Sequence, residues 1–183
     1  MNVISTPFQG LFILEPRVFG DDRGYFFESF NEQVFEKATG FTQKFVQDNQ
    51  ARSVKNVLRG LHYQNNPLAQ SKLIRCLQGS IWDVVVDLRR DSKTYKQWYG
   101  LELNDSNKLQ FLIPQGFAHG YSVLSDTAEV FYKCDNFYSK ENEGGVFYND
   151  PSLAIDWKIN LDEAIISDKD KVQPLLAECN SKF

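Results

Sequence analysis

The fold class follows from one segment in the middle of the chain, Ile81-Trp82-Asp83-Val84-Val85-Val86-Asp87-Leu88. In a β-strand, successive side chains point to opposite faces, so the even-numbered residues share one face and the odd-numbered residues share the other. The odd-numbered face carries both carboxylates. This alternation predicts a strand in a sheet whose carboxylate-bearing face is either a partly polar interior or exposed to solvent.

Similar short segments continue in both directions from this strand. Each is rich in β-branched or aromatic residues, and turn residues separate it from the next at a spacing of about ten residues. They cover residues 11–14, 25–30, 44–50, 71–77, 98–103, 108–113, 120–124 and 128–134. Many short strands at this spacing are typical of a sandwich or a barrel.

We therefore expect one all-β domain over residues 1–183, a jelly-roll barrel with short helical additions near both termini. Asn31 can cap a helix over residues 32–38 that Gly40 ends, and the chain from about residue 149 predicts one or two short helices. A closed barrel can enclose a ligand cavity. Sheets this rich in aromatic residues also tend to bury a second surface against a partner, so we expect a homodimer.

Composition narrows the function classes. The chain has 24 acidic and 20 basic residues and a pI near 5.2, which argues against nucleic-acid binding because that requires a basic face. No apolar run reaches the ~18 residues of a membrane-spanning helix, and no signal peptide is evident at the N-terminus. The three cysteines form no C-x-x-C pair and are expected to be reduced thiols of a cytoplasmic protein.

Only two histidines are present, His62 and His119. One chain therefore cannot supply a three-histidine metal site, and no His-x-His pair exists because Tyr63 and Gln64 follow His62. We expect no metal and no other cofactor. The glycine-rich loops that bind dinucleotides or phosphates and the Gly-x-Ser-x-Gly elbow of hydrolases are also absent.

Two segments could carry chemistry in the first half of the chain. Arg59-Gly60-Leu61-His62 lies where one strand is expected to give way to another, and it combines a proton-transfer group with an anion-binding group. The structural alternative is a turn histidine with a satisfied hydrogen bond. Lys72 and Arg75 lie three residues apart on one strand, so one of them points inward if the strand is regular. An inward lysine needs a partner or an anionic ligand, whereas an edge-strand cation needs neither.

Three further candidates lie in the second half. Tyr132 shares a face with apolar residues and is expected to point inward, either as a core aromatic or as a proton donor. His119 lies between Gly116 and Gly120, and by itself it is only weak evidence for a functional site. Asp170 follows Ser167 by three residues, which resembles a helix capping box; the functional alternative is a carboxylate that orients a histidine.

The sequence as a whole resembles the dTDP-4-dehydrorhamnose 3,5-epimerase family of cupins, from about residue 8 to residue 176. The resemblance consists of eight blocks in order. They are Phe19-Gly20-Asp21-Asp22-Arg23-Gly24, Phe45-Val46-Gln47-Asp48-Asn49, Val57-Leu58-Arg59-Gly60-Leu61-His62-Tyr63-Gln64, Ala69-Gln70-Ser71-Lys72-Leu73, Asp83-Val84-Val85-Val86-Asp87, Ile113-Pro114-Gln115-Gly116-Phe117-Ala118-His119-Gly120, Tyr132-Lys133 and Ser167-Asp168-Lys169-Asp170.

This resemblance implies a metal-free epimerase that inverts C3 and C5 of a dTDP-linked 4-keto-6-deoxyhexose in dTDP-L-rhamnose synthesis. His62 would be the general base with Asp170 as its partner, Tyr132 the general acid, and Lys72 the cation that stabilises the enolate. The residues implied to bind the substrate are Arg23, Glu28, Gln47, Asp48, Asn49, Arg59, His119, Tyr138, Glu143 and Lys169, with the Tyr138 ring on thymine. The resemblance also suggests that the N-terminal strand crosses to a partner subunit.

Two other functions remain open at this stage. A single-carbon epimerase, acting at C3 or C5 of another nucleotide-linked sugar, would need nearly the same residues. A non-enzymatic sugar-nucleotide binding protein could share the fold, but it would have no need of the base and acid pair His62 and Tyr132. The sequence does not give the base preference of the nucleotide or the order of epimerisation.

Overall fold

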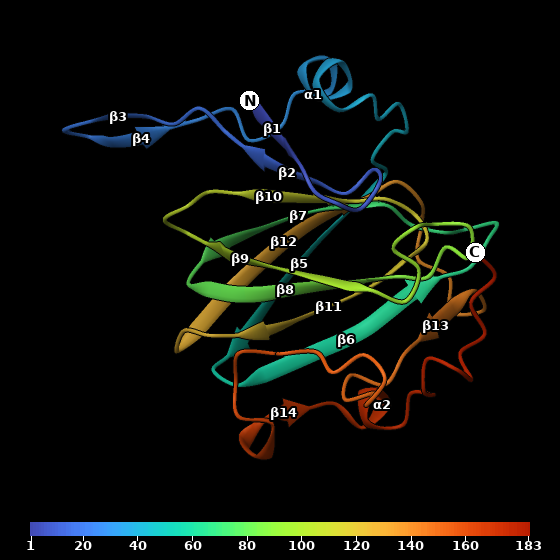
Figure 1. Cartoon of the computed structure of the whole chain (residues 1–183). Helices are drawn as coiled ribbons and strands as arrows, with labels where there is room; N and C mark the ends of the chain where they lie inside the picture. The colour runs from blue at the N-terminus through green and yellow to red at the C-terminus, as the bar shows by residue number, and fades with distance from the viewer.

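Two six-stranded sheets face each other in the computed structural model, which describes all residues from Met1 to Phe183 (Figure 1). The first sheet has the strand order β1 (Asn2–Ser5), β2 (Phe12–Glu15), β10 (Gln110–Ile113), β7 (Lys72–Gln78), β12 (Thr127–Cys134), β5 (Gln47–Val54). The second has the order β13 (Glu143–Gly145), β6 (Val57–Gln64), β11 (Phe117–Val123), β8 (Ser80–Asp87), β9 (Trp98–Asn104). The predicted all-β jelly roll is therefore confirmed.

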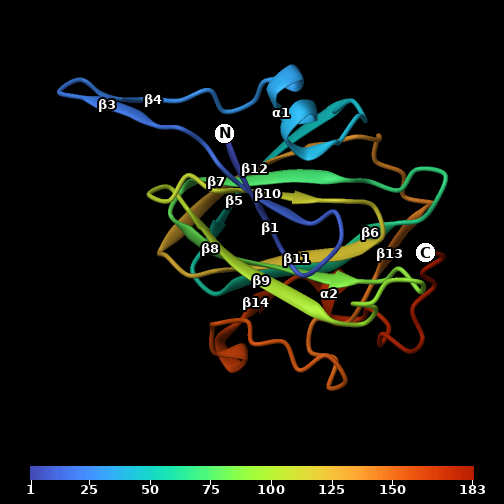
Figure 2. The same ribbon diagram turned by 45° about the horizontal axis from the view of Figure 1, so that its top comes forward.

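The pairing within both sheets is antiparallel. The short strand β14 (Ile165–Ile166) adds to the edge of β6 in parallel. A separate hairpin, β3 (Phe19–Asp21) and β4 (Gly24–Phe26), projects away from both sheets (Figures 1 and 2). The predicted strand over residues 25–30 is thus shorter than expected and belongs to this hairpin.

Short helices lie near both ends, as the sequence predicts. Helix α1 (Glu32–Thr39) begins after Asn31, whose side chain accepts a hydrogen bond from the Val34 amide, and ends at Gly40 in the left-handed conformation. A 3₁₀ turn (Leu161–Glu163) and helix α2 (Asp168–Lys171) follow in the C-terminal part. No helix is long and apolar enough to cross a membrane.

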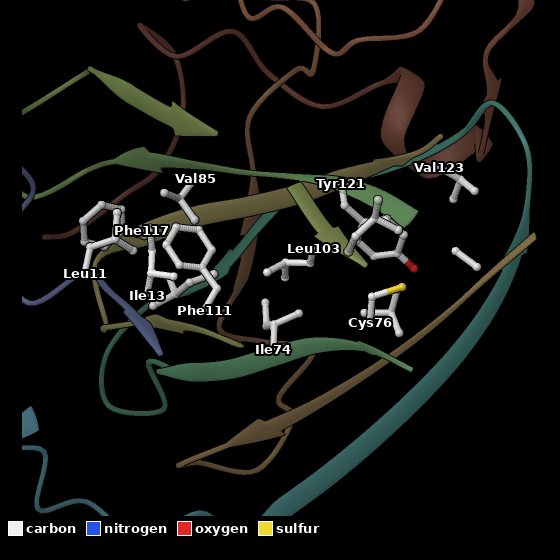
Figure 3. Close-up of a cluster of buried hydrophobic side chains, with 14 of the residues drawn as sticks. Leu11, Ile13, Ile74, Cys76, Val85, Leu103, Phe111, Phe117, Tyr121 and Val123 are labelled. Carbon is white, nitrogen blue, oxygen red and sulfur yellow. The ribbon is translucent and has the colours of Figure 1, made fainter. Parts of the chain in front are cut away.

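The core has an apolar layer between the sheets and two outer layers. Figure 3 shows the central layer, in which Ile74 and Phe111 of the first sheet meet Val85 and Leu103 of the second. The C-terminal segment covers the outer face of β6, β8 and β11 through Trp157 and other apolar residues. A smaller cluster packs α1 against the outer face of the first sheet. Since both faces of β8 are covered, the strand is buried on both sides.

This burial settles how the carboxylates of β8 are placed. Asp83 and Asp87 are both 0% exposed, so their face, which also carries Val85 of the apolar layer, is a partly polar interior and not a solvated one. Asp83 pairs with His119, and Asp87 accepts hydrogen bonds from Arg89 and two hydroxyls. Buried carboxylates need such partners because desolvation of an unpaired charge is very unfavourable.

The expected break between strands at residues 59–62 is wrong, because β6 runs through them. Gly60 has φ of +130°, and a Cβ at this position would lie 2.6 Å from the Gly120 Cα of the neighbouring strand β11. The glycine is therefore required for close approach of two paired strands, and not for a turn. As a result His62 lies on a strand that faces the space between the sheets.

Candidate active site

A cleft between the sheets contains two adjoining cavities. The larger has a volume of about 540 Å³ and the smaller of about 180 Å³. His62, Lys72 and Tyr132 line both of them, so these three residues lie where the cavities meet. Because side chains alternate along β6, β7 and β12, the inward-facing positions of these strands bring together three of the predicted catalytic residues.

His62 and Asp170 form a close pair at this junction. His62 Nε2 lies 2.6 Å from Asp170 Oδ1, and the Asp170 side chain is only 4% exposed. The second carboxylate oxygen accepts a hydrogen bond from the Gly60 amide at 3.3 Å. Burial alone would raise the pKa of Asp170, but the hydrogen bonds from His62, Gly60 and Ser167 outweigh it and lower the pKa. The carboxylate is therefore held ionised beside the imidazole.

The capping interpretation of Ser167 and Asp170 holds in part. The Ser167 hydroxyl accepts a hydrogen bond from the Asp170 amide at 3.2 Å and caps α2. The Asp170 carboxylate, in contrast, does not return to the Ser167 amide but reaches the histidine. The short helix α2 therefore serves to present one carboxylate to β6.

Lys72 points into the cleft and Arg75 points away from it, which confirms that only one of these two cations faces inward. Arg75 lies over the rings of Phe27 and Phe131 on the outer face of the first sheet. Burial lowers the pKa of Lys72, and nearby acidic groups, among them Asp83, partly oppose the shift. A partly buried ammonium in a cavity favours an anionic or polarised oxygen as its ligand.

Tyr132 comes from the opposite wall to His62, because β12 belongs to the first sheet and β6 to the second. Its backbone pairs with Asn49 of β5 and Ile74 of β7, which fixes its side chain toward the cleft. Burial raises the pKa of Tyr132 to about 12. The phenol therefore keeps its proton at neutral pH and can donate it.

A second histidine–carboxylate pair lies deeper in the cleft. His119 Nε2 is 3.0 Å from both oxygens of Asp83, and the two side chains come from the paired strands β11 and β8. Burial lowers the pKa of His119, and the charge of Asp83 opposes the shift. Sequence reasoning missed Asp83 as a site residue, although its inward carboxylate on an apolar strand was a visible signal.

The smaller cavity is lined mainly by amides and by hydroxyl or carboxyl groups. Gln47, Asn49, Tyr138 and Glu143 are among them. The Tyr138 hydroxyl donates to Glu143 at 3.0 Å, and Gln47 accepts from the Tyr138 amide at 2.9 Å. Lys169, which lines the larger cavity, pairs with Glu143. Polar groups around an exposed aromatic ring suit a nucleotide base and its sugar.

Arg59 lies at the rim of the larger cavity, where its Nε donates to the Ser53 hydroxyl at 3.1 Å. Three other predicted substrate-binding residues line neither cavity. Asp48 alternates outward on β5 and pairs with Lys133 at 3.0 Å. Arg23 is at the tip of the projecting hairpin with a side chain that is 90% exposed, and Glu28 accepts from Asn31 in the segment after it.

Potential metal ligands are not clustered in the chain. No group of three or more His, Cys, Asp or Glu side chains is placed to hold a metal ion. The two histidine–carboxylate pairs are separate from each other, and each histidine faces one aspartate. What the junction of the two cavities holds is an imidazole, a phenol and an ammonium, from His62, Tyr132 and Lys72.

Known proteins resemble the chain along almost its full length. The family model described as dTDP-4-dehydrorhamnose 3,5-epimerase matches residues 5–178. A dTDP-4-dehydrorhamnose 3,5-epimerase of Shigella flexneri is 53% identical over 170 residues, which cover 93% of this chain and 93% of the relative.

Solved structures agree with this similarity. The dTDP-4-dehydrorhamnose 3,5-epimerase from Elizabethkingia anophelis has a TM-score of 0.93 and 53% identity, with 97% of both chains covered. The dTDP-6-deoxy-D-glucose-3,5-epimerase from Legionella pneumophila, in complex with dTDP-4-keto-L-rhamnose, has a TM-score of 0.93 and 47% identity over 97% of this chain and 93% of that chain.

Proposed function

The chain belongs to the dTDP-4-dehydrorhamnose 3,5-epimerase family, and from that premise we propose how its residues carry out the reaction. The chain is an isomerase of dTDP-L-rhamnose biosynthesis. It inverts C3 and C5 of a dTDP-linked 4-keto-6-deoxyhexose, the two carbons that flank the C4 ketone. The roles of individual residues follow from their places in the cleft.

His62 removes the proton. A C–H bond next to a ketone is acidic because the electron pair that it leaves moves onto the C4 oxygen. With the Nε2–H of His62 donated to Asp170, the lone pair lies on Nδ1, and the carboxylate stabilises the imidazolium that forms. Lys72, a partly buried cation in the same cavity, stabilises the enolate oxygen.

Tyr132 returns a proton on the other side of the ring. Inversion requires that the new C–H bond forms on the face opposite to the one that lost its proton. The base and the phenol belong to facing sheets and line the same cavities, so a sugar ring between them would be approached from both faces. This opposed placement of His62 and Tyr132 is the observation that carries the proposal.

The rest of the substrate occupies the polar part of the cleft. Gln47 and Asn49 offer amides, and Arg59, His119, Glu143 and Lys169 offer charged or hydrogen-bonding groups. Arginine in particular matches the geometry of diphosphate oxygens. Tyr138, which is 56% exposed, presents a ring on which thymine can stack.

The active form is proposed to be a homodimer in the cytoplasm. The β3–β4 hairpin exposes Phe19 by 50%, Tyr25 by 61% and Phe26 by 71%, which is unusual for a monomer surface. Arg23 and Glu28, which the family resemblance places at the substrate, lie far along this hairpin and the segment after it. Insertion of the hairpin into the cleft of a second copy would bury the aromatic rings and supply both residues. The free thiols support a reducing compartment.

Replacement of His62 by alanine tests the assignment of the base. The variant should lose turnover of dTDP-4-dehydro-6-deoxy-D-glucose while it still binds dTDP, because His62 is not among the groups proposed for the nucleotide. Binding is measured by calorimetry and turnover by NMR of the sugar. Turnover near the unmodified rate would contradict the role of His62.

A further inference from the structure

Tyr121 is a buried phenol in the active-site cleft to which the proposed reaction gives no role. It lies on β11, lines the larger cavity and is 5% exposed. Its hydroxyl oxygen is buried and makes no hydrogen bond in the structure, although the Ser53 hydroxyl lies near enough to lower the pKa of Tyr121. Figure 3 shows its ring within the central apolar cluster, with the oxygen at the outer end. An unsatisfied buried hydroxyl is unfavourable, so a phenylalanine would be the better core residue.

The surroundings of Tyr121 connect it with the proton donor. Tyr132 packs against the apolar cluster that contains Tyr121, and both side chains line the larger cavity. Tyr121 is also one of the groups that raise the pKa of Tyr132, after burial itself, so the two phenols are near enough to interact. Arg59, which pairs with Tyr121 across the strands β6 and β11, lowers the pKa of both Tyr121 and Tyr132.

Arg59, on β6 of the second sheet, is held in place by a contact with the first sheet. Its Nε donates to the hydroxyl of Ser53 on β5, and Ser53 is 5% exposed. One guanidinium and one hydroxyl donor of the second sheet therefore border the larger cavity, which Tyr132 lines from the first sheet. A cation and a hydroxyl donor beside the same cavity can stabilise an oxygen anion that forms there.

Resting on the proposed role of Tyr132 as the acid, we propose that Tyr121 is a positioning residue whose hydroxyl donates a hydrogen bond to the Tyr132 oxygen once that oxygen has lost its proton. In this step the O–H bond of Tyr132 breaks and a C–H bond forms at the substrate carbon. The electron pair of the O–H bond remains on the phenolate. Tyr121 keeps its own proton, and water later restores the proton of Tyr132.

The role predicts a specific kinetic signature. Removal of the substrate proton by His62 does not involve Tyr121, so exchange of the C3 and C5 hydrogens with solvent should continue. Delivery of a proton to the opposite face should slow, because the phenolate is less stable. A merely structural role would instead lower both rates together or change neither.

The experiment measures exchange and inversion separately for the full chain in D2O, with dTDP-4-dehydro-6-deoxy-D-glucose as substrate. NMR reports deuterium at C3 and C5 and the configuration of the product. The variants are Tyr121→Phe, Tyr132→Phe and the double variant. Tyr99→Phe is the matched control, because Tyr99 packs against the same apolar cluster but lines neither cavity. Thermal unfolding of each variant is followed in parallel.

The expected result for Tyr121→Phe is inversion slowed by about tenfold or more, exchange within about twofold of the unmodified rate, and a Tm that is unchanged or higher. In the Tyr132→Phe background the same substitution should add nothing to the loss of inversion. The proposal is overturned if inversion is unchanged, if the effect is the same in both backgrounds, if Tyr132→Phe leaves inversion intact, or if Tm falls and both rates fall together. If the unmodified chain shows neither exchange nor inversion, the proposed function fails first and this inference with it.

Discussion

Replacement of Asp170 by asparagine changes one atom in the pair that is proposed to activate His62. Asparagine fills the same volume, so the cap of α2 by Ser167 and the packing around the side chain should persist. Two properties are lost. The negative charge 2.6 Å from the His62 ring disappears, and the amide can donate to the ring nitrogen, which would place the lone pair on Nε2 and the proton on Nδ1.

The size of the effect follows from these two losses. A hydrogen bond between charged groups contributes about 1.5–3 kcal/mol. The His62 side chain is 31% exposed, and partial hydration of the imidazolium favours a value of about 2 kcal/mol. Each 1.36 kcal/mol changes a rate by about tenfold, so the lost charge alone should lower kcat about 30-fold. The inverted tautomer should take the loss toward about 10³-fold.

The assay is steady-state turnover of dTDP-4-dehydro-6-deoxy-D-glucose together with dTDP affinity. KM and dTDP affinity should stay within a few-fold, since the proposed nucleotide contacts are elsewhere. Asp150→Asn is the matched control: Asp150 is 3% exposed and accepts hydrogen bonds from Ser152 and from the Leu176 amide, away from the cleft. It should lower stability and leave kcat intact. A kcat of Asp170→Asn within threefold of the unmodified rate would refute the reasoning.

The same substitution should change the acid stability of the fold. The pKa of Asp170 in the folded chain lies below the ordinary value of 3.8. A depressed pKa stabilises the fold above the unfolded value, and this contribution is lost as pH falls through the folded pKa. Asp170→Asn should therefore be less stable at neutral pH and should lose less stability than the unmodified chain below pH 3.8, as measured by denaturant unfolding.

Three further predictions follow from other parts of the structure. Since burial lowers the pKa of Lys72 from 10.5, kcat should decline at a pH below 10.5, and Lys72→Arg should retain partial activity with this decline moved upward, because arginine stays charged; a decline at the same pH in both proteins would contradict the assignment to Lys72. If the partner supplies Arg23, equal amounts of the inactive variants Arg23→Ala and His62→Ala should regain about a quarter of the sites after subunit exchange, whereas no recovery in a dimer that exchanges subunits would exclude a shared site. Gly60→Ala should lower stability by about 2–4 kcal/mol more than Gly24→Ala, because both glycines have φ of +130° but only Gly60 faces a neighbouring backbone; equal Tm values would show that the close approach of the strands is not important.

The strands were predictable because their signal is local. Alternation of side chains over residues 81–88 is visible in the sequence, and β8 occupies Ser80–Asp87. The break expected at residues 59–62 was wrong. A glycine in the sequence suggests a turn as long as the strand that pairs with it is unknown. Gly60 is required because Gly120, sixty residues later, leaves no room for a side chain, and this contact is known only once the two strands are seen to pair.

The candidate site was also predictable only in part. His62, Lys72, Tyr132 and Asp170 were named from motif blocks, and the fold brings them to one cleft. Family resemblance could not show that Asp48, between two inward residues, faces outward. Arg23 and Glu28 lie on the projecting hairpin and the segment after it, and their contact with substrate rests on the proposed second copy of the chain. The burial of Asp83 and its pairing with His119 required the register of β8 and β11.

The most direct test of the central claim is the uptake of solvent deuterium by the substrate. The chain is incubated with dTDP-4-dehydro-6-deoxy-D-glucose in D2O, and NMR locates deuterium and configuration in the product, with His62→Ala as the control. The account predicts deuterium at both C3 and C5, inverted configuration at both carbons, and loss of both in the control. Deuterium at only one carbon would identify a single-carbon epimerase, and deuterium at neither carbon would contradict the proposed chemistry.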